Sequence, residues 1–118
     1  MANILVAEDD PAVRDFVSRA LEAHGYSVET ASDGGAALEE LQQRGYDLLL
    51  TDIMMPVMDG IALALQAAEL HPHMPILMMT GYSGQKERAH NLDALIEDVL
   101  LKPFNLDQLR KAVSAALA

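Results

Sequence analysis

Acidic residues stand directly after two apolar runs of this chain, and together they could bind a divalent cation. Glu8 and Asp9 follow the run at 4–7, and Asp52 follows the run at 48–51. If these runs are neighbouring parallel strands, the three carboxylates meet at one edge of a sheet. Mg²⁺ prefers oxygen ligands and keeps some of its waters, so the cluster predicts a Mg²⁺ site that Mn²⁺ could also fill.

Two further strand ends would add a hydroxyl group and an ammonium group to this cluster. Thr80 ends the apolar run at 75–80, and Lys102 follows the run at 96–101. Together with the cation, these side chains would hold the oxygens of a phosphoryl group and neutralise their charge. Asp52 could then act as the nucleophile toward phosphorus, so the residues predict a phosphoryl-transfer site.

Each of these residues also has an ordinary structural interpretation. Glu8 and Asp9 could complement the dipole of a following helix, and Asp52 could be a turn residue before Pro56. The threonine and the lysine could be a plain strand residue and a solvated charge. At any single position, the structural interpretation explains the residue as well as a role in the site does. Four strand ends that all carry such groups favour the site.

Apolar runs alternate with amphipathic segments along the whole chain, which predicts an α/β fold with a parallel sheet covered by helices on both faces. The predicted strands are residues 3–8, 26–30, 47–52, 75–80 and 96–101. The predicted helices follow Asp10, Ser32 or Asp33, Gly60 and Asn105, and a further helix is expected within 83–95, where the apolar stripe is thin. The chain is predicted to be one domain, 1–118, long enough to bury its own core.

Helix signals are clearest at two places. Asp10 followed by Pro11 predicts a capped helix start, and Asn105 with Gln108 predicts a capping box. The stripe of the first helix that is expected to face the core is Val13, Phe16, Val17, Ala20 and Leu21.

The composition argues against several functions. A net charge of −10 disfavours a nucleic-acid surface, and the absence of cysteine rules out disulfides and thiolate metal sites. The four histidines have no ligand spacing and are expected to be solvated on the surface. No apolar run approaches the roughly 18 residues of a membrane span, and the start shows no targeting segment. We therefore expect a soluble cytoplasmic protein without membrane or nucleic-acid partners.

Five motifs, in this order and spacing, strongly resemble the receiver domain of two-component response regulators. They are Glu8-Asp9, residues 51–56 (TDIMMP), Asp59-Gly60, Thr80-Gly81 and Lys102-Pro103-Phe104. The resemblance covers essentially the whole chain. It implies a flavodoxin-like (CheY-like), doubly wound, five-stranded parallel sheet with strand order 2-1-3-4-5.

The resemblance also implies roles for individual residues. The implied metal ligands are Asp9, Asp52, the backbone carbonyl of Met54 and, through water, Glu8. Asp52 would be the phosphoacceptor, and Thr80 and Lys102 would bind the phosphoryl group. A cis peptide between Lys102 and Pro103 would aim the lysine into the site.

One position departs from the family pattern, and a nearby tyrosine could take over its role. Many receivers have an aromatic residue three positions before the lysine that swings inward on phosphorylation, and this chain has Val99 there. We expect Tyr82 to move in its place, although it could simply cover the site. Met54 and Tyr82 occupy the positions that flank the phosphoryl group and are poor at orienting water, so slow self-dephosphorylation is expected.

The resemblance implies a histidine kinase or histidine phosphotransfer protein as phosphodonor and a downstream protein as target. Self-phosphorylation from a phosphodonor and slow self-dephosphorylation would be the only reactions. The chain ends at the last predicted helix, so a stand-alone receiver, monomeric or weakly dimeric, is expected. Residues 1–10 and 48–56 are similar to CpdR-type cell-cycle regulators, in which the unphosphorylated form helps deliver substrates to a Clp-type protease; this implies Clp-type protease machinery as a partner.

Two alternatives remain open from the residues. The chain could be a receiver excised from a hybrid histidine kinase or a longer response regulator. It could also be a phosphatase that uses Asp52 as nucleophile, but such enzymes commonly carry a second aspartate two residues later, where this chain has Met54.

Overall fold

The protein folds around one parallel sheet of five strands. The structure, a computed structural model, describes residues 1–81, 84, 89, 92 and 94–118. The strands are β1 (Asn3–Ala7), β2 (Ser27–Ala31), β3 (Leu48–Asp52), β4 (Ile76–Thr80) and β5 (Asp98–Leu101). Their order is β2-β1-β3-β4-β5 and all four pairings are parallel, so the predicted fold class and strand order are confirmed.

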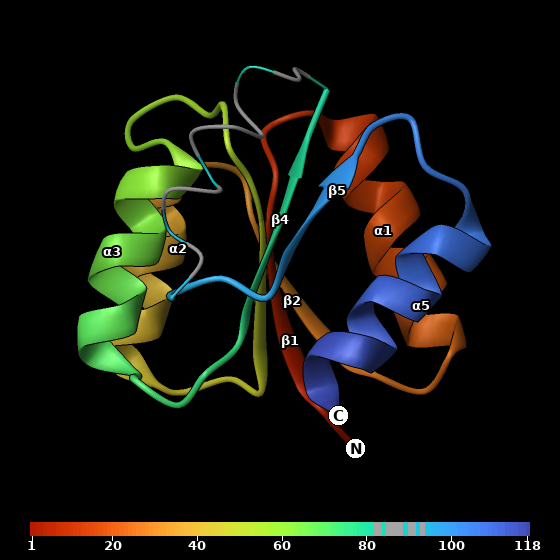
Figure 1. The fold of residues 1–118 in the computed structure, drawn as a ribbon, viewed down its shortest axis with the longest axis horizontal. Helices are drawn as coiled ribbons and strands as arrows, with labels where there is room; N and C mark the ends of the chain where they lie inside the picture. Colours follow the sequence, from red (N-terminus) through yellow and green to blue (C-terminus); the bar gives the residue numbers. More distant parts are fainter. Residues whose placement is uncertain (82–83, 85–88, 90–91, 93) are drawn as a thin grey trace.

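Helices cover both faces of this sheet (Figure 1). They are α1 (Pro11–Ala23), α2 (Gly34–Gln43), α3 (Gly60–Leu70) and α5 (Leu106–Leu117). Helices α1 and α5 lie on one face, and α2 and α3 lie on the other. The helix expected within 83–95 falls largely outside the described residues. No helix of the part described is both long and apolar enough to cross a bilayer.

The helix starts follow the predicted capping chemistry. The Asp10 side chain accepts a hydrogen bond from the Ala12 N–H at 2.9 Å, and Pro11 opens α1. The backbone N–H of Gln108 donates to the side chain of Asn105, whose own N–H donates back to the Gln108 side chain. This capping box satisfies amides that have no partner inside the helix.

The core has two layers because strand side chains alternate between the faces of the sheet. Leu5 and Leu49 pack toward α2 and α3, together with Leu41 and Leu63. The opposite layer is formed with α1 and α5 and contains Ile4, Val6, Val17, Leu21, Leu48, Leu50, Leu109 and Val113. All five residues of β3 are buried, as a central strand covered on both faces requires.

Two sequence-based expectations about exposure are wrong. Helical spacing predicts Phe16 in the core stripe of α1, but the residue is 44% exposed, and the centre of its ring lies 6.4 Å from that of Phe104. Val17 and Leu21 already fill the space between α1 and the sheet, so Phe16 turns toward the loop before α5. His71 is half-buried, and its Nε2 lies 2.7 Å from the Leu41 carbonyl oxygen, a tertiary contact that local sequence does not encode.

Candidate functional site

The ends of β1 and β3 bring three carboxylates together, as predicted. One carboxylate oxygen from each of Glu8, Asp9 and Asp52 lies within 4.8 Å of the other two. Glu8 and Asp9 directly follow β1, and Asp52 is the last residue of the neighbouring strand β3. Glu8 and Asp52 are buried, whereas Asp9 is exposed, so the cluster opens to solvent on the Asp9 side.

Lys102 follows β5 and reaches into this cluster. Its Nζ lies 2.5 Å from Glu8 Oε1 and 3.4 Å from Asp52 Oδ2. Its backbone N–H donates to the Thr80 carbonyl at 2.8 Å, and the Lys102–Pro103 peptide is cis, as the resemblance implied. Thr80 itself is fully buried at the end of β4. The four strand ends therefore gather the predicted groups at one edge of the sheet.

The close ion pair between Lys102 and Glu8 differs from what the sequence predicts. From the sequence, the lysine is expected to bind a phosphoryl group, and Glu8 is expected to lie one water from a cation. The two residues are 94 positions apart, and no local pattern pairs them. In the structure the lysine ammonium lies close to both Glu8 and Asp52, so its positive charge compensates the negative charge of both buried carboxyl groups.

The backbone around Asp52 is fixed by hydrogen bonds from two backbone N–H groups and by a close contact at Gly60. The Ile53 N–H donates to Asp52 Oδ1 at 3.0 Å, and the Gly60 N–H donates to the Ile53 carbonyl at 2.7 Å. A Cβ on Gly60 would lie 2.1 Å from the Asp52 carbonyl oxygen, so only glycine allows this approach. Both ends of the loop 53–59 are therefore held next to Asp52.

Burial changes the protonation of the two inner acids. It raises the pKa of Glu8 to about 7, although the hydrogen bond from Lys102 acts in the opposite direction. Burial also raises the pKa of Asp52, and the charge of Lys102 only partly offsets this. For Lys102, burial acts to lower the pKa, but the hydrogen bond to Glu8 and the charge of Asp52 outweigh it, so the pKa is raised and the ammonium stays charged.

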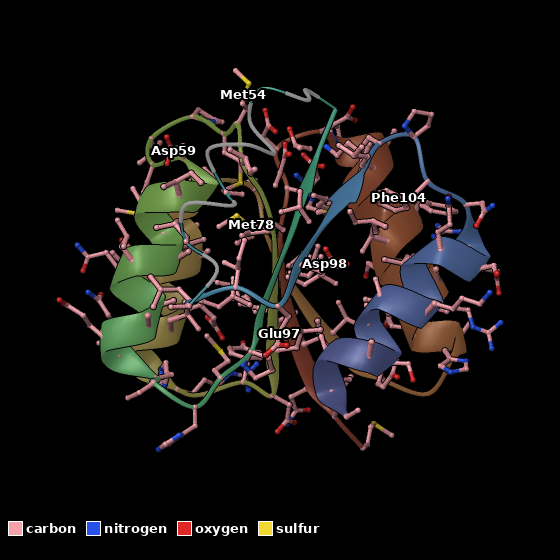
Figure 2. All side chains as sticks on the ribbon, viewed as in Figure 1. Met54, Asp59, Met78, Glu97, Asp98 and Phe104 are labelled. Carbon is pink, nitrogen blue, oxygen red and sulfur yellow. The ribbon has the colours of Figure 1, made fainter. Side chains whose placement is uncertain are left out.

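The donor set fits a hard divalent cation. Lys102 pairs with the two buried carboxyl groups, Glu8 and Asp52, and the exposed Asp9 lies beside them, so ionising all three acids leaves more negative charge than this ammonium carries, which a cation would neutralise. All three side chains offer oxygen, the donor that Mg²⁺ prefers. Met54 lies on the loop after β3, is 47% exposed and points to the outer edge of the molecule (Figure 2). Its side chain offers no oxygen, so only its backbone carbonyl is a candidate donor.

Val99, which departs from the family pattern, and Tyr82, its expected substitute, have different outcomes. Val99 is buried in β5 opposite Met78 of β4, within the layer that faces α2 and α3. It fills the core and carries no polar group toward the site. Tyr82 lies outside the described residues, so its expected gating role stays a prediction.

A largely apolar groove, which the sequence did not indicate, borders the site on the side of α1. It is lined by Ala12, Val13, Phe16, Lys102, Pro103 and Phe104. Figure 2 shows Phe104 on the α1 side of the sheet. Lys102 belongs both to the groove and to the acidic cluster, so the groove adjoins the cluster at this side chain. The Phe16 ring could have signalled the groove, but its helical spacing matched the core stripe.

Comparisons with known proteins agree with this geometry. Residues 4–114 match the family model of the response regulator receiver domain. The response regulator MprA of Mycobacterium leprae is 41% identical over 97% of this chain, and the chain spans 50% of the length of MprA. The response regulator receiver protein CpdR of Brucella abortus is 41% identical over 99% of this chain and 98% of its own length.

A solved structure shares the same architecture. The response regulator TrrA of Thermotoga maritima, solved in complex with Mg²⁺ and BeF, superposes with a TM-score of 0.89 at 31% identity, covering 99% of this chain and all of that one. Both the sequence of this chain and the arrangement of its strands and helices therefore agree with one family. The chain belongs to the response regulator receiver domains of two-component systems.

Proposed function

We propose that this receiver domain, formed by residues 1–118, accepts a phosphoryl group on Asp52 from a phosphohistidine and signals by binding a partner protein. Receiver domains are in general signalling modules and not enzymes. The observation that carries the proposal is the meeting of three carboxylates within 4.8 Å, with Lys102 3.4 Å from Asp52. Such an arrangement can direct an anionic substrate to one particular carboxylate.

In the transfer step, an oxygen of the ionised Asp52 carboxylate forms a bond to phosphorus. The bond between phosphorus and the imidazole nitrogen of the donor breaks, and that nitrogen keeps the electron pair. Lys102 keeps its charge in this environment and is close enough to Asp52 to pair with a phosphoryl oxygen. The hydroxyl of Thr80 would hold another phosphoryl oxygen from the end of β4.

The cation would be held by the acidic cluster. The proposed ligands are Asp9, Asp52, the backbone carbonyl of Met54 and, through water, Glu8. When bound, Mg²⁺ or Mn²⁺ supplies positive charge that neutralises the phosphoryl oxygens. Two features of the cluster support this assignment: its donor atoms are all oxygens, and it carries an excess of negative charge.

We further propose that the phosphorylated form decays slowly, with a lifetime of minutes or longer. Met54, two residues after Asp52, has a side chain with no group that could orient or activate an attacking water. Self-phosphorylation from small phosphodonors and this slow hydrolysis would be the only reactions of the domain.

The groove beside Lys102 supports a histidine kinase or histidine phosphotransfer protein as the phosphodonor. Its apolar lining and the exposed Phe16 ring suit a helix of the donor that carries the phosphohistidine. Because CpdR is similar over nearly its whole length, we also propose a CpdR-type output, with Clp-type protease machinery as downstream partner, in the cytoplasm.

Phosphorylation by acetyl phosphate tests this function. Purified wild type incubated with Mg²⁺ and acetyl phosphate should shift in a phosphate-affinity gel, and Asp52→Asn should not. Asp59→Asn is the matched control, because Asp59 caps α3 at the far end of the same loop and should still allow the shift. If both variants still shift, or if neither of them shifts, the assignment of Asp52 is contradicted.

A further inference from the structure

The loop that begins at Asp52 is supported at its tip by the first residues of α2. In Figure 1 the loop 53–59 arches over the end of the helical layer formed by α2 and α3. A Cβ on Gly34 would lie 2.0 Å from the Met58 carbonyl oxygen, and one on Gly35 would lie 2.8 Å from Val57 Cγ1. The loop backbone therefore rests directly on a helix start that has no side chain at the point of contact.

The tip of this loop holds an unfavourable turn. Val57 has a φ of 71°, and the Met58 N–H donates to the Pro56 carbonyl at 2.8 Å. A three-residue turn with a positive φ at its centre is a strained form, and a β-branched residue adopts it rarely. Val57 is 83% exposed, so burial of its side chain does not offset this strain. The turn must therefore be held by the backbone contacts on either side of it.

These contacts connect the helix start to the site. The loop leaves the sheet at Asp52, passes Met54, turns at Val57 and returns at Gly60, where it packs on the Asp52 carbonyl. Both ends of the loop are thus fixed at Asp52, and its tip is fixed at Gly34. Moving the tip changes the direction of the loop backbone, including the carbonyl of Met54.

We propose that Gly34 is a positioning residue of the phosphorylation site, which acts through the Met58 carbonyl and the positive-φ turn at Val57 to orient the loop that carries Met54. This inference rests on the proposed function, because it assigns to Gly34 a role in cation binding. A role in packing alone would predict that substitutions at Gly34 lower stability and leave the cation affinity of the folded protein unchanged.

Calorimetric titration with Mg²⁺, at a temperature where each protein is folded by circular dichroism, separates these roles. Gly34→Ala should raise the dissociation constant about tenfold or more, the size typical of losing a group that orients a metal ligand. Gly45→Ala is the matched control at the other end of α2, because a Cβ there has no neighbour closer than 3.6 Å. Its dissociation constant should stay within about twofold of wild type, since an ordinary contact needs no rearrangement.

A second pair of variants decides the matter if Gly34→Ala does not fold. Val57→Asn accepts the positive φ and should leave the affinity for Mg²⁺ unchanged while raising the melting temperature. Val57→Pro fixes φ near −65° and should weaken binding about tenfold, although the side chain it replaces is exposed.

The outcomes separate this inference from the proposed function. If wild type binds Mg²⁺ and folded Gly34→Ala and Val57→Pro bind it equally well, Gly34 has no positioning role and the phosphoacceptor function still stands. If wild type does not bind Mg²⁺, the proposed function fails and this inference fails with it.

Discussion

Changing the pH should change the affinity of the site for Mg²⁺, mainly through Glu8. Burial raises the pKa of Glu8 to about 7, so the group is mostly ionised at pH 8 and mostly protonated at pH 6. With that pKa, the ionised fraction falls from about nine-tenths to about one-tenth between these two values. If the cation binds the ionised form, its affinity falls about tenfold, or about 1.4 kcal/mol, as the pH is lowered from 8 to 6.

Calorimetric titration of the same protein at the two pH values measures this difference directly. Glu8→Gln removes the titrating group, and most of the pH dependence should disappear with it. Burial also raises the pKa of Asp52, so any decrease that comes from Asp52 should be present in both proteins. Glu40→Gln is a control outside the site, because Glu40 pairs with Arg44 and Tyr46 at the end of α2. An equal loss of affinity in wild type and Glu8→Gln would refute the role assigned to Glu8.

Three further variants test the fold and the groove. Gly60→Ala should lose at least about 2 kcal/mol in urea denaturation, because its Cβ would meet the Asp52 carbonyl at 2.1 Å, and a loss no larger than that of Gly45→Ala would contradict this. Leu50→Ala should lose about 2–5 kcal/mol, since Leu50 is fully buried in β3, and an unchanged denaturation midpoint would argue against this burial. Phe16→Ala should slow phosphotransfer from the donor protein about tenfold by removing a contact worth about 1.4 kcal/mol, but should leave the rate with acetyl phosphate unchanged; equal slowing of both reactions would remove the groove from donor binding.

The parts of the site that the sequence predicts are those that local patterns encode. An acid that directly follows an apolar run marks a strand end, and this pattern, together with a parallel sheet in which the two runs are neighbours, predicted Glu8, Asp9 and Asp52 at one edge of the sheet. Helix starts were predictable for the same reason, because the Asp10 cap involves residues two positions apart.

The remaining features depend on contacts between distant segments or on backbone geometry. The Lys102–Glu8 pair joins residues 94 positions apart, so no spacing rule could have found it. The positive φ of Val57 was not predictable, because valine rarely adopts it and because the loop around it packs on Gly34 and Gly35, which are distant in sequence. Phe16 matched the helical period of a core residue. Only the packing of α1 and α5 on the sheet shows that Val17 and Leu21 fill the core there and leave Phe16 no space.

The most direct test is to identify the atom that receives phosphate. After reaction with acetyl phosphate and Mg²⁺, borohydride reduction converts an aspartyl phosphate to homoserine, and peptide mass spectrometry locates that residue. Homoserine at position 52, and none at Asp9 or Asp59, is the predicted result. Homoserine at another position, or an unmodified chain under conditions where Mg²⁺ is bound, would contradict the assignment of Asp52 as the phosphoacceptor.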